Sequence, residues 1–137
     1  MRSLRFAEVI AMEKELVFPK GISPIGPYSP GVIASGKLLF VSGQIPLNPE
    51  TGELVRGAFK EMARQAIKNL LSVVEAAGGS AENVVKVTVY LRDMGKYAEF
   101  NEVYSEFFNE SRPARAVVEV SNLPKGVEVE IEAIAVL

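Results

Sequence analysis

The chain has 137 residues, of which 48% are hydrophobic and 23% charged, a composition typical of one globular domain with a substantial core. It contains no histidine, cysteine or tryptophan. This excludes catalytic triads and dyads that use an imidazole or a thiol, metal sites built from thiolates or imidazoles, and redox-active dithiols. The net charge of -2, from 15 basic and 17 acidic residues, gives no long-range attraction for nucleic acid, so a nucleic-acid partner is not expected.

The first eleven residues carry Arg2 and Arg5 but have neither the long apolar region nor the cleavage site of a signal peptide. We expect residues 1–11 to form a disordered or loosely docked N-terminal extension, with Met12 as a second candidate start and residues 12–137 as a single domain. Charged residues interrupt every apolar stretch well before the ~20 residues that a membrane-spanning helix needs. We therefore expect a soluble, cytoplasmic protein with no membrane partner.

The first structural elements expected along the chain are three short strands. Glu15–Phe18 is the first, and the prolines and glycines of residues 19–30 then predict a long non-helical loop. Two further apolar runs, Val32–Ala34 and Leu38–Ser42, flank a turn at residues 35–37. This spacing predicts a hairpin whose two strands belong to one sheet.

Two helices with a strand between them are expected next. Apolar residues recur at helical spacing from Phe59 to Ala77, and the glycine pair that follows would end this helix. Apolar and polar residues alternate from Val85 to Leu91, which is typical of a half-buried strand. A second apolar stripe runs from Tyr97 to Phe108 and predicts the second helix.

The C-terminal part predicts two more strands around a tight turn at residues 123–126. Pro113 disfavours an interior helix, and the β-branched residues after it favour an extended chain. Because side chains alternate along a strand, Arg115 shares a face with Val117. The last strand, residues 127–135, carries Glu128, Glu130 and Glu132 on one side. We expect this order to place an arginine and a carboxylate on neighbouring strands.

The predicted order is β-β-β-α-β-α-β-β, which indicates an α+β fold with two helices covering one face of a mixed sheet. Runs such as residues 38–41 are too apolar for a sheet with one solvated face. The helices cover only one face, so we expect the second face to be covered by oligomerisation. The sequence lacks Gly-x-Gly-x-x-Gly and Walker-type phosphate loops, so we expect no cofactor and no metal.

Several spaced motifs resemble the RidA family, also called YjgF/UK-type proteins, from about residue 15 to the C-terminus. In chain order they are Ile25-Gly-Pro-Tyr28-Ser-Pro-Gly31, Val41-Ser-Gly-Gln-Ile-Pro46 with Asn48-Pro-Glu-Thr-Gly52, Val87-Thr-Val-Tyr-Leu-Arg-Asp93, Arg112-Pro-Ala-Arg115 and Val129-Glu-Ile-Glu-Ala-Ile-Ala135. The resemblance implies a chorismate-mutase-like fold and a homotrimer whose sheets form an inner barrel. It also implies active sites in the three clefts between subunits.

The implied activity is hydrolytic deamination of 2-imino acids, such as 2-iminobutanoate and 2-iminopropanoate, to 2-oxo acids and ammonia. Arg115 matches the arginine that binds the substrate carboxylate, and a planar guanidinium can hold a carboxylate through two parallel hydrogen bonds. Glu130 matches the glutamate of the last strand, which could activate water as a general base. Tyr28 matches the tyrosine of the Gly-Pro-Tyr loop, where its phenol could bond substrate or water.

The resemblance implies four further substrate-binding positions. Ser42 and Gly43 match a Ser-Gly pair at the end of a strand, and Asn101 falls where the family has a helix asparagine. Val117 stands where some bacterial relatives have a cysteine. A valine there preserves any role of the backbone N–H but changes the pocket, and cysteine-dependent regulation does not transfer to this chain.

Each of these residues also has a structural interpretation. Arg115 could instead form an ion pair with Glu119 or another acid, Glu130 could be a solvated strand carboxylate, and Tyr28 could plug the cleft wall. Two other function classes stay open beside the deaminase. One is a trimer that binds 2-oxo acids or similar metabolites without turnover; the other is an endoribonuclease or translation-associated protein, which the absence of histidine and the slight acidity disfavour.

Overall fold

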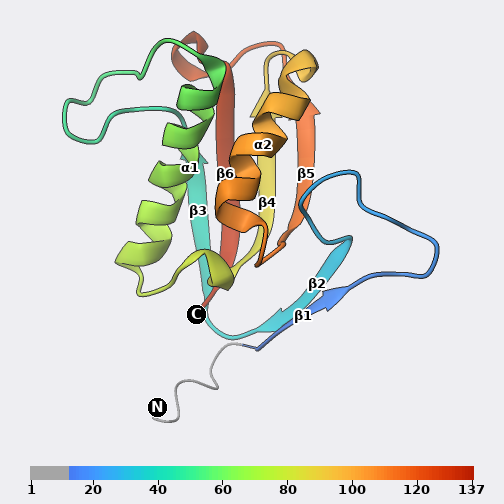
Figure 1. Cartoon of the computed structure of the whole chain (residues 1–137). Coiled ribbons are helices and arrows are strands. Elements are labelled where there is room, and N and C mark those ends of the chain that lie inside the picture. Colours follow the sequence, from blue (N-terminus) through green and yellow to red (C-terminus); the bar gives the residue numbers. More distant parts are fainter. Residues whose placement is uncertain (1–12) are drawn as a thin grey trace.

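The computed structural model describes residues 13–137, so the predicted N-terminal extension and Met12 lie outside the described residues. Six strands and two α-helices form the described part of the chain, in the predicted order β-β-β-α-β-α-β-β (Figure 1). They are β1 (Glu13–Val17), β2 (Gly31–Ser35), β3 (Leu38–Gln44), α1 (Phe59–Ala76), β4 (Val84–Leu91), α2 (Tyr97–Phe108), β5 (Ala114–Glu119) and β6 (Val129–Val136).

The main sheet has four strands in the order β3-β6-β4-β5. Strands β4 and β5 run parallel, while the β3–β6 and β4–β6 pairs are antiparallel, so the sheet is mixed. The antiparallel β1–β2 pair forms a separate two-stranded sheet. The parallel pair is connected through α2, as parallel neighbours require a crossover.

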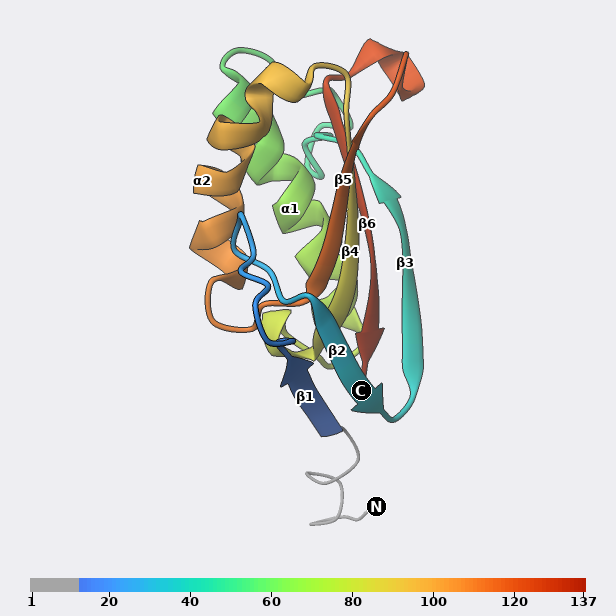
Figure 2. The same ribbon diagram turned by 90° about the vertical axis from the view of Figure 1, so that its right-hand side faces the viewer.

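Both helices pack on the same face of the four-stranded sheet (Figure 2). The apolar stripe of α1 is buried against the sheet because its residues recur every three or four positions. The buried side chains of α2 are Phe100, Val103, Tyr104 and Phe108. They belong to the same hydrophobic core as alternate residues of β4, namely Val87, Val89 and Leu91. This core confirms the α+β architecture, with two helices covering one face of a mixed sheet.

The predicted hairpin between Val32–Ala34 and Leu38–Ser42 is wrong. Strand β2 pairs with β1, whereas β3 pairs with β6, so the two runs belong to different sheets. The cause lies at Lys37, whose N–H donates to the carbonyl of Leu137 at 3.1 Å and whose carbonyl accepts from Leu137 N–H at 2.8 Å. The backbone groups of Lys37 are thus hydrogen-bonded to the C-terminal residue, and β3, which follows Lys37, pairs with β6.

The two C-terminal strands are not neighbours, which corrects a second expectation. Strand β4 lies between β5 and β6. The connecting segment passes over the end of β4, where Val120 N–H donates to Leu91 O at 2.9 Å and Arg92 N–H donates to Glu128 O at 3.1 Å. Both edges of β4 are therefore paired, with β6 on one side and β5 on the other.

The face of the sheet opposite the helices has no covering element among residues 13–137 (Figure 2). We call it the open face. Two large apolar side chains of β3, Leu38 and Phe40, are 60% and 68% exposed, and Val118 of β5 is 41% exposed. Helices within the described range are all too short or too polar to cross a membrane.

Candidate active site

The loop between β1 and β2 is fixed to the start of β5 through a buried serine. Ser29 is only 1% exposed. Its N–H donates to the carbonyl of Pro113 at 3.3 Å, and its hydroxyl donates to the carbonyl of Arg112 at 2.6 Å. These bonds hold the preceding residues, including Tyr28, over β5 beside Arg115.

Arg115 projects from β5 toward the helix side of the sheet, where aromatic rings surround it. Its guanidinium carbon lies 4.7 Å from the ring centroid of Tyr104, 5.1 Å from that of Tyr28 and 5.7 Å from that of Tyr97. Nη2 also donates to the Tyr97 hydroxyl at 3.1 Å. Cation–π contacts favour a charged guanidinium in this environment without neutralising its charge.

Helix α2 supplies the wall above Arg115. Tyr97, Asn101 and Tyr104 occupy positions i, i+4 and i+7 of α2, so they lie on one face of the helix. Asn101 approaches the guanidinium at Gly26, where an added Cβ would lie 2.8 Å from Arg115 Nη2 and 3.4 Å from Asn101 Nδ2. A glycine at position 26 therefore lets the loop close over the arginine and the asparagine together.

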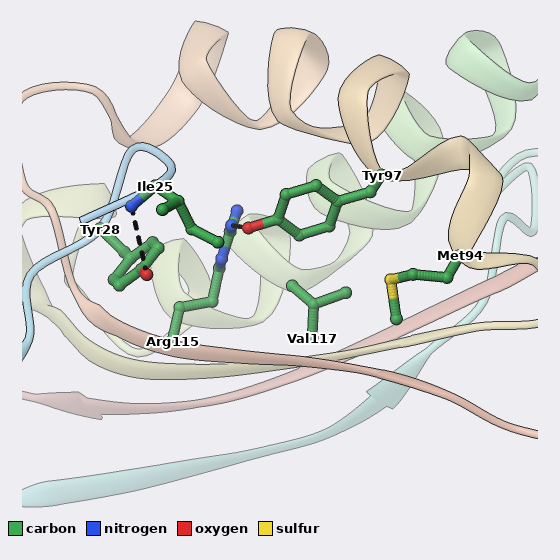
Figure 3. Close-up of a pocket in the computed structure, with 6 residues that line it drawn as sticks. All are labelled: Ile25, Tyr28, Met94, Tyr97, Arg115 and Val117. Carbon is green, nitrogen blue, oxygen red and sulfur yellow. Dashed lines mark hydrogen bonds between the residues drawn. The ribbon is translucent and has the colours of Figure 1, made fainter.

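A cavity of about 540 Å³ opens beside the guanidinium. Figure 3 shows Tyr28 and Ile25 on one side of Arg115 and Tyr97 on the other, with Val117 of β5 and then Met94 farther along that side. This volume falls within the range of small-molecule sites, and the lining is mostly apolar around one fixed cation. The cavity suits a small anion that carries an apolar group.

Arg115 lacks a carboxylate partner within 4.0 Å among residues 13–137. The ion pair with Glu119 considered above is absent, and Glu119 Oε1 accepts the N–H of Met94 at 2.8 Å. Nη1 of Arg115 is buried and has no hydrogen-bond partner within the described chain. A cation held this way gains strongly from binding an anion in its cleft.

Glu130 lies on the opposite face of the sheet from Arg115. Register fixes this: Arg115 is opposite Val87 of β4, which is buried beneath the helices, whereas Glu130 is opposite Tyr90 of β4. Val87 and Tyr90 are three residues apart on one strand, so their side chains point to opposite faces. Within one chain, the sheet therefore separates the Arg115 and Glu130 side chains.

Glu130 instead lies beside Gly43 at an irregularity of β3. The β3–β6 register shifts between Val41 and Gln44, and a Cβ added to Gly43 would overlap the carboxylate of Glu130. Ser42, next to Gly43, is exposed. The neighbouring Glu132 accepts a hydrogen bond from Tyr90 Oη at 3.0 Å, and this bond raises the pKa of Tyr90.

The predicted site residues thus divide into two groups. Arg115, Tyr28, Val117 and Asn101 gather at the cleft on the helix side, and Ser42, Gly43 and Glu130 gather where β3 meets β6. Sequence reasoning missed the two tyrosines of α2 that flank Arg115, because their positions in the apolar stripe identified them only as core residues. They stand four residues before and three residues after Asn101, and this spacing could have indicated that the three side chains share one face of the helix.

Between residues 13 and 137 there is no group of three or more acidic side chains arranged to hold an ion. The chemistry of both groups is that of a guanidinium, phenols, a carboxylate and a serine.

The sequence and fold are those of a known family. The model of the family described as Endoribonuclease L-PSP matches residues 18–137. A RutC family protein of Pyrococcus horikoshii is 54% identical over 123 residues, covering 89% of this chain and 97% of that protein. The 2-iminobutanoate/2-iminopropanoate deaminase of Mus musculus is 46% identical over 125 residues, covering 91% and 92%.

Solved structures agree with these sequence relatives. The structure of E. coli TdcF with bound serine superposes with a TM-score of 0.70 at 41% identity, covering 88% of this chain and 93% of that one. The chain belongs to the Endoribonuclease L-PSP family, which is the YjgF/RidA family that its motifs resemble.

Proposed function

We propose that this protein hydrolyses 2-imino acids, such as 2-iminobutanoate and 2-iminopropanoate, to 2-oxo acids and ammonia. The observation that carries the proposal is Arg115, a guanidinium fixed among three aromatic rings with no carboxylate of the described chain to neutralise it. A 2-imino acid presents a carboxylate next to an electrophilic C=N carbon. The name of the mouse relative and the serine bound to E. coli TdcF support a ligand with an amino-acid skeleton.

Binding and orientation would provide much of the catalysis. The planar guanidinium holds the carboxylate through charge-assisted hydrogen bonds, so the adjacent C=N carbon lies at a fixed place in the cleft. The apolar wall of Val117 and Met94 accommodates the side chain of the substrate. Fixing the reacting carbon in this way removes much of the entropic barrier to attack by water.

The reaction needs only water and proton transfers. The water oxygen bonds to the imine carbon while the C=N electron pair moves to nitrogen, giving a carbinolamine. The carbinolamine then re-forms a C=O bond and expels ammonia, after a water proton has passed to nitrogen. A carboxylate near the attacking water can accept that proton and return it. Glu130 is the candidate base.

Glu130 must reach the cleft from a second copy of the chain, because within one chain the sheet separates it from Arg115. We propose a homotrimer in which the open faces meet at the centre and each cleft combines Arg115 of one chain with Glu130 and Gly43 of the next. The exposed Leu38 and Phe40 support this assembly, because burying them removes apolar surface from water.

The test is ammonia release from imines made in the assay by an amino-acid oxidase, comparing wild type with Arg115→Ala and Arg115→Lys. We expect both variants to lose about 100-fold or more of kcat/KM, because the charged hydrogen bonds or their forked geometry are lost. The matched control is Arg92→Lys, an exposed arginine whose guanidinium donates to the carbonyl of Gly126. Near-wild-type rates in both Arg115 variants would refute the assignment.

The same preparation separates the two other function classes. A protein that binds 2-oxo acids without turnover would show 2-oxobutanoate binding that depends on Arg115 but no acceleration of ammonia release. A ribonuclease would cleave RNA. If its active site lay outside the cleft, Arg115→Ala would leave the rate of RNA cleavage unchanged. Accelerated imine hydrolysis that depends on Arg115 distinguishes the deaminase from both.

A further inference from the structure

Tyr104 differs from its neighbours on α2 in a way that core packing does not require. It lies in a buried aromatic stack, with ring centroids 5.6 Å from Phe100 and 4.6 Å from Phe108. All three side chains are fully buried. Phenylalanine fills the two outer positions, and only the ring that faces Arg115 carries a hydroxyl. Burying a hydroxyl is costly unless it is hydrogen-bonded, so packing alone would favour phenylalanine here as well.

The buried polar atoms around Tyr104 form a matching set. Three of them have no hydrogen-bond partner within the described chain: Nη1 of Arg115, the hydroxyl of Tyr104 and Oδ1 of Asn101. The first can only donate, the last can only accept, and a tyrosine hydroxyl does both. Tyr104 and Asn101 lie three residues apart on α2, on the face that covers Arg115.

We propose that Tyr104 is a positioning residue for Arg115, and that its hydroxyl links Nη1 of the guanidinium to Oδ1 of Asn101 in one chain of hydrogen bonds. A small side-chain rotation or one bridging water closes this chain, with the same three partners in either case. Its role is to fix the rotation of the guanidinium, so that the edge facing the cavity stays in the plane that a carboxylate needs. The predicted effect on substrate binding rests on the proposed function, whereas the hydrogen-bonded arrangement of the three side chains does not.

The surroundings agree with this role. The ring of Tyr104 lies nearest to the guanidinium of the three aromatic rings, at 4.7 Å, and it contacts the guanidinium from the interior. Tyr97 holds the other nitrogen, Nη2, at 3.1 Å. In the proposed arrangement, two tyrosines of α2 hold the two terminal nitrogens of one guanidinium. Burial raises the pKa of Tyr104, which keeps its hydroxyl protonated and able to donate.

The direct test is ¹⁵N NMR of the arginine side chain, which reports rotation about the Cζ–Nε bond whether or not the protein is an imine hydrolase. In the wild type we expect two separate Nη signals for Arg115, assigned by their loss in Arg115→Lys. In Tyr104→Phe we expect them to exchange faster and to broaden, because Nη1 has lost its partner and Tyr97 alone holds the guanidinium. Tyr90→Phe removes a hydroxyl on the open face, bonded to Glu132, and should leave the Arg115 signals unchanged.

A second measurement connects the geometry to binding. Tyr104→Phe should weaken 2-oxobutanoate binding and raise KM about tenfold while changing kcat little, because the loss of one hydrogen bond loosens the carboxylate anchor. In an Arg115→Lys background the same change should have no further effect on binding. A merely structural role would give the same loss in both backgrounds.

Asn101→Ala provides an independent variant if Tyr104→Phe does not fold. It removes the other end of the hydrogen-bond chain and should also speed the exchange of the Arg115 Nη signals. Nη exchange at the wild-type rate in both variants would overturn the proposal. Absence of 2-oxobutanoate binding in the wild type would count against the proposed function instead, and the NMR result would still decide the role of Tyr104.

Discussion

Arg115 and Glu130 lie on opposite faces of the same four-stranded sheet, and β4 separates their strands. The backbone of the sheet stands between the two side chains, so one chain cannot place both around one small substrate. A site that uses both residues must take them from different copies. This relationship connects the proposed chemistry to the proposed assembly and leads to the following predictions.

Substitution of Glu130 should lower the activity far more than substitution of its strand neighbour Glu132. Glu130→Gln keeps the shape of the side chain but removes the base, and general-base catalysis contributes typically 10²–10⁴-fold, so we expect kcat to fall about 100-fold or more. Affinity for 2-oxobutanoate should change little. Glu132 accepts from Tyr90 at 3.0 Å, which an amide oxygen can also do, so Glu132→Gln should stay within about twofold of wild type. Equal activity in the two variants would remove Glu130 from the mechanism.

Gly43 should matter for activity more than for stability. A Cβ at this position would overlap the carboxylate of Glu130. Gly43→Ala should therefore displace the carboxylate, and a displacement of about 1 Å can lower the rate about 100-fold. Gly31→Ala is the matched control, because its Cβ would meet only Val17 at an ordinary 3.6 Å. Steady-state rates and Tm of both variants check this, and similar rates in the two would contradict it.

The pH dependence of the unfolding free energy at alkaline pH should report the titration of the buried Tyr104 hydroxyl. Burial raises the pKa of its hydroxyl above the usual 10.0, and the nearby Arg115 opposes this shift. Below pH 10 the hydroxyl is protonated in both states and its contribution to stability is fully present. Above pH 10 the unfolded chain loses the proton first, so stability falls by about 1.4 kcal/mol per pH unit until the folded pKa is reached.

Tyr104→Phe should remove that part of the pH dependence. Urea unfolding between pH 9 and pH 11.5 should give a free energy that falls less steeply in the variant than in the wild type. Parallel curves for the two proteins would show that Tyr104 does not titrate in this way. The comparison needs no assumption about activity.

The open face should mediate assembly. Light scattering at native concentration should give the mass of a trimer for the wild type. Phe40→Lys places a charge where 68% of an apolar side chain is exposed in one chain, and it should shift the protein toward monomers because a buried charge lacks a partner. Ile22→Lys, at an exposed position on the loop between β1 and β2, is the control and should remain trimeric. An active wild-type monomer would refute the shared site.

The order and type of the elements could be predicted because local pattern determines them. The helical stripes of α1 and α2 and the alternation in β4 recur in the structure with small shifts at their ends. The pairing of strands could not be predicted in the same way, because it depends on distant partners. Lys37 pairs with Leu137, a contact that no local pattern encodes, and it separates β2 from β3.

The candidate site shows the same limit. Motifs identified Arg115 and Tyr28, which lie together at one cleft, and Glu130, which does not reach it. Periodicity correctly assigns a side chain to one face of its strand, but the faces of different strands can be compared only once the register is known. Tyr104 escaped notice because a buried aromatic in a helix stripe has the same spacing whether it packs a core or orients an arginine.

The most direct test of the shared site is complementation between two inactive variants. Arg115→Ala and Glu130→Gln are co-expressed with different tags, and mixed oligomers are purified through both tags and verified by native mass spectrometry. If each cleft combines Arg115 of one chain with Glu130 of the next, every mixed trimer contains one intact cleft in three, so the purified mixed oligomers should recover about a third of wild-type imine hydrolysis. Mixed oligomers as inactive as either variant alone would contradict the account.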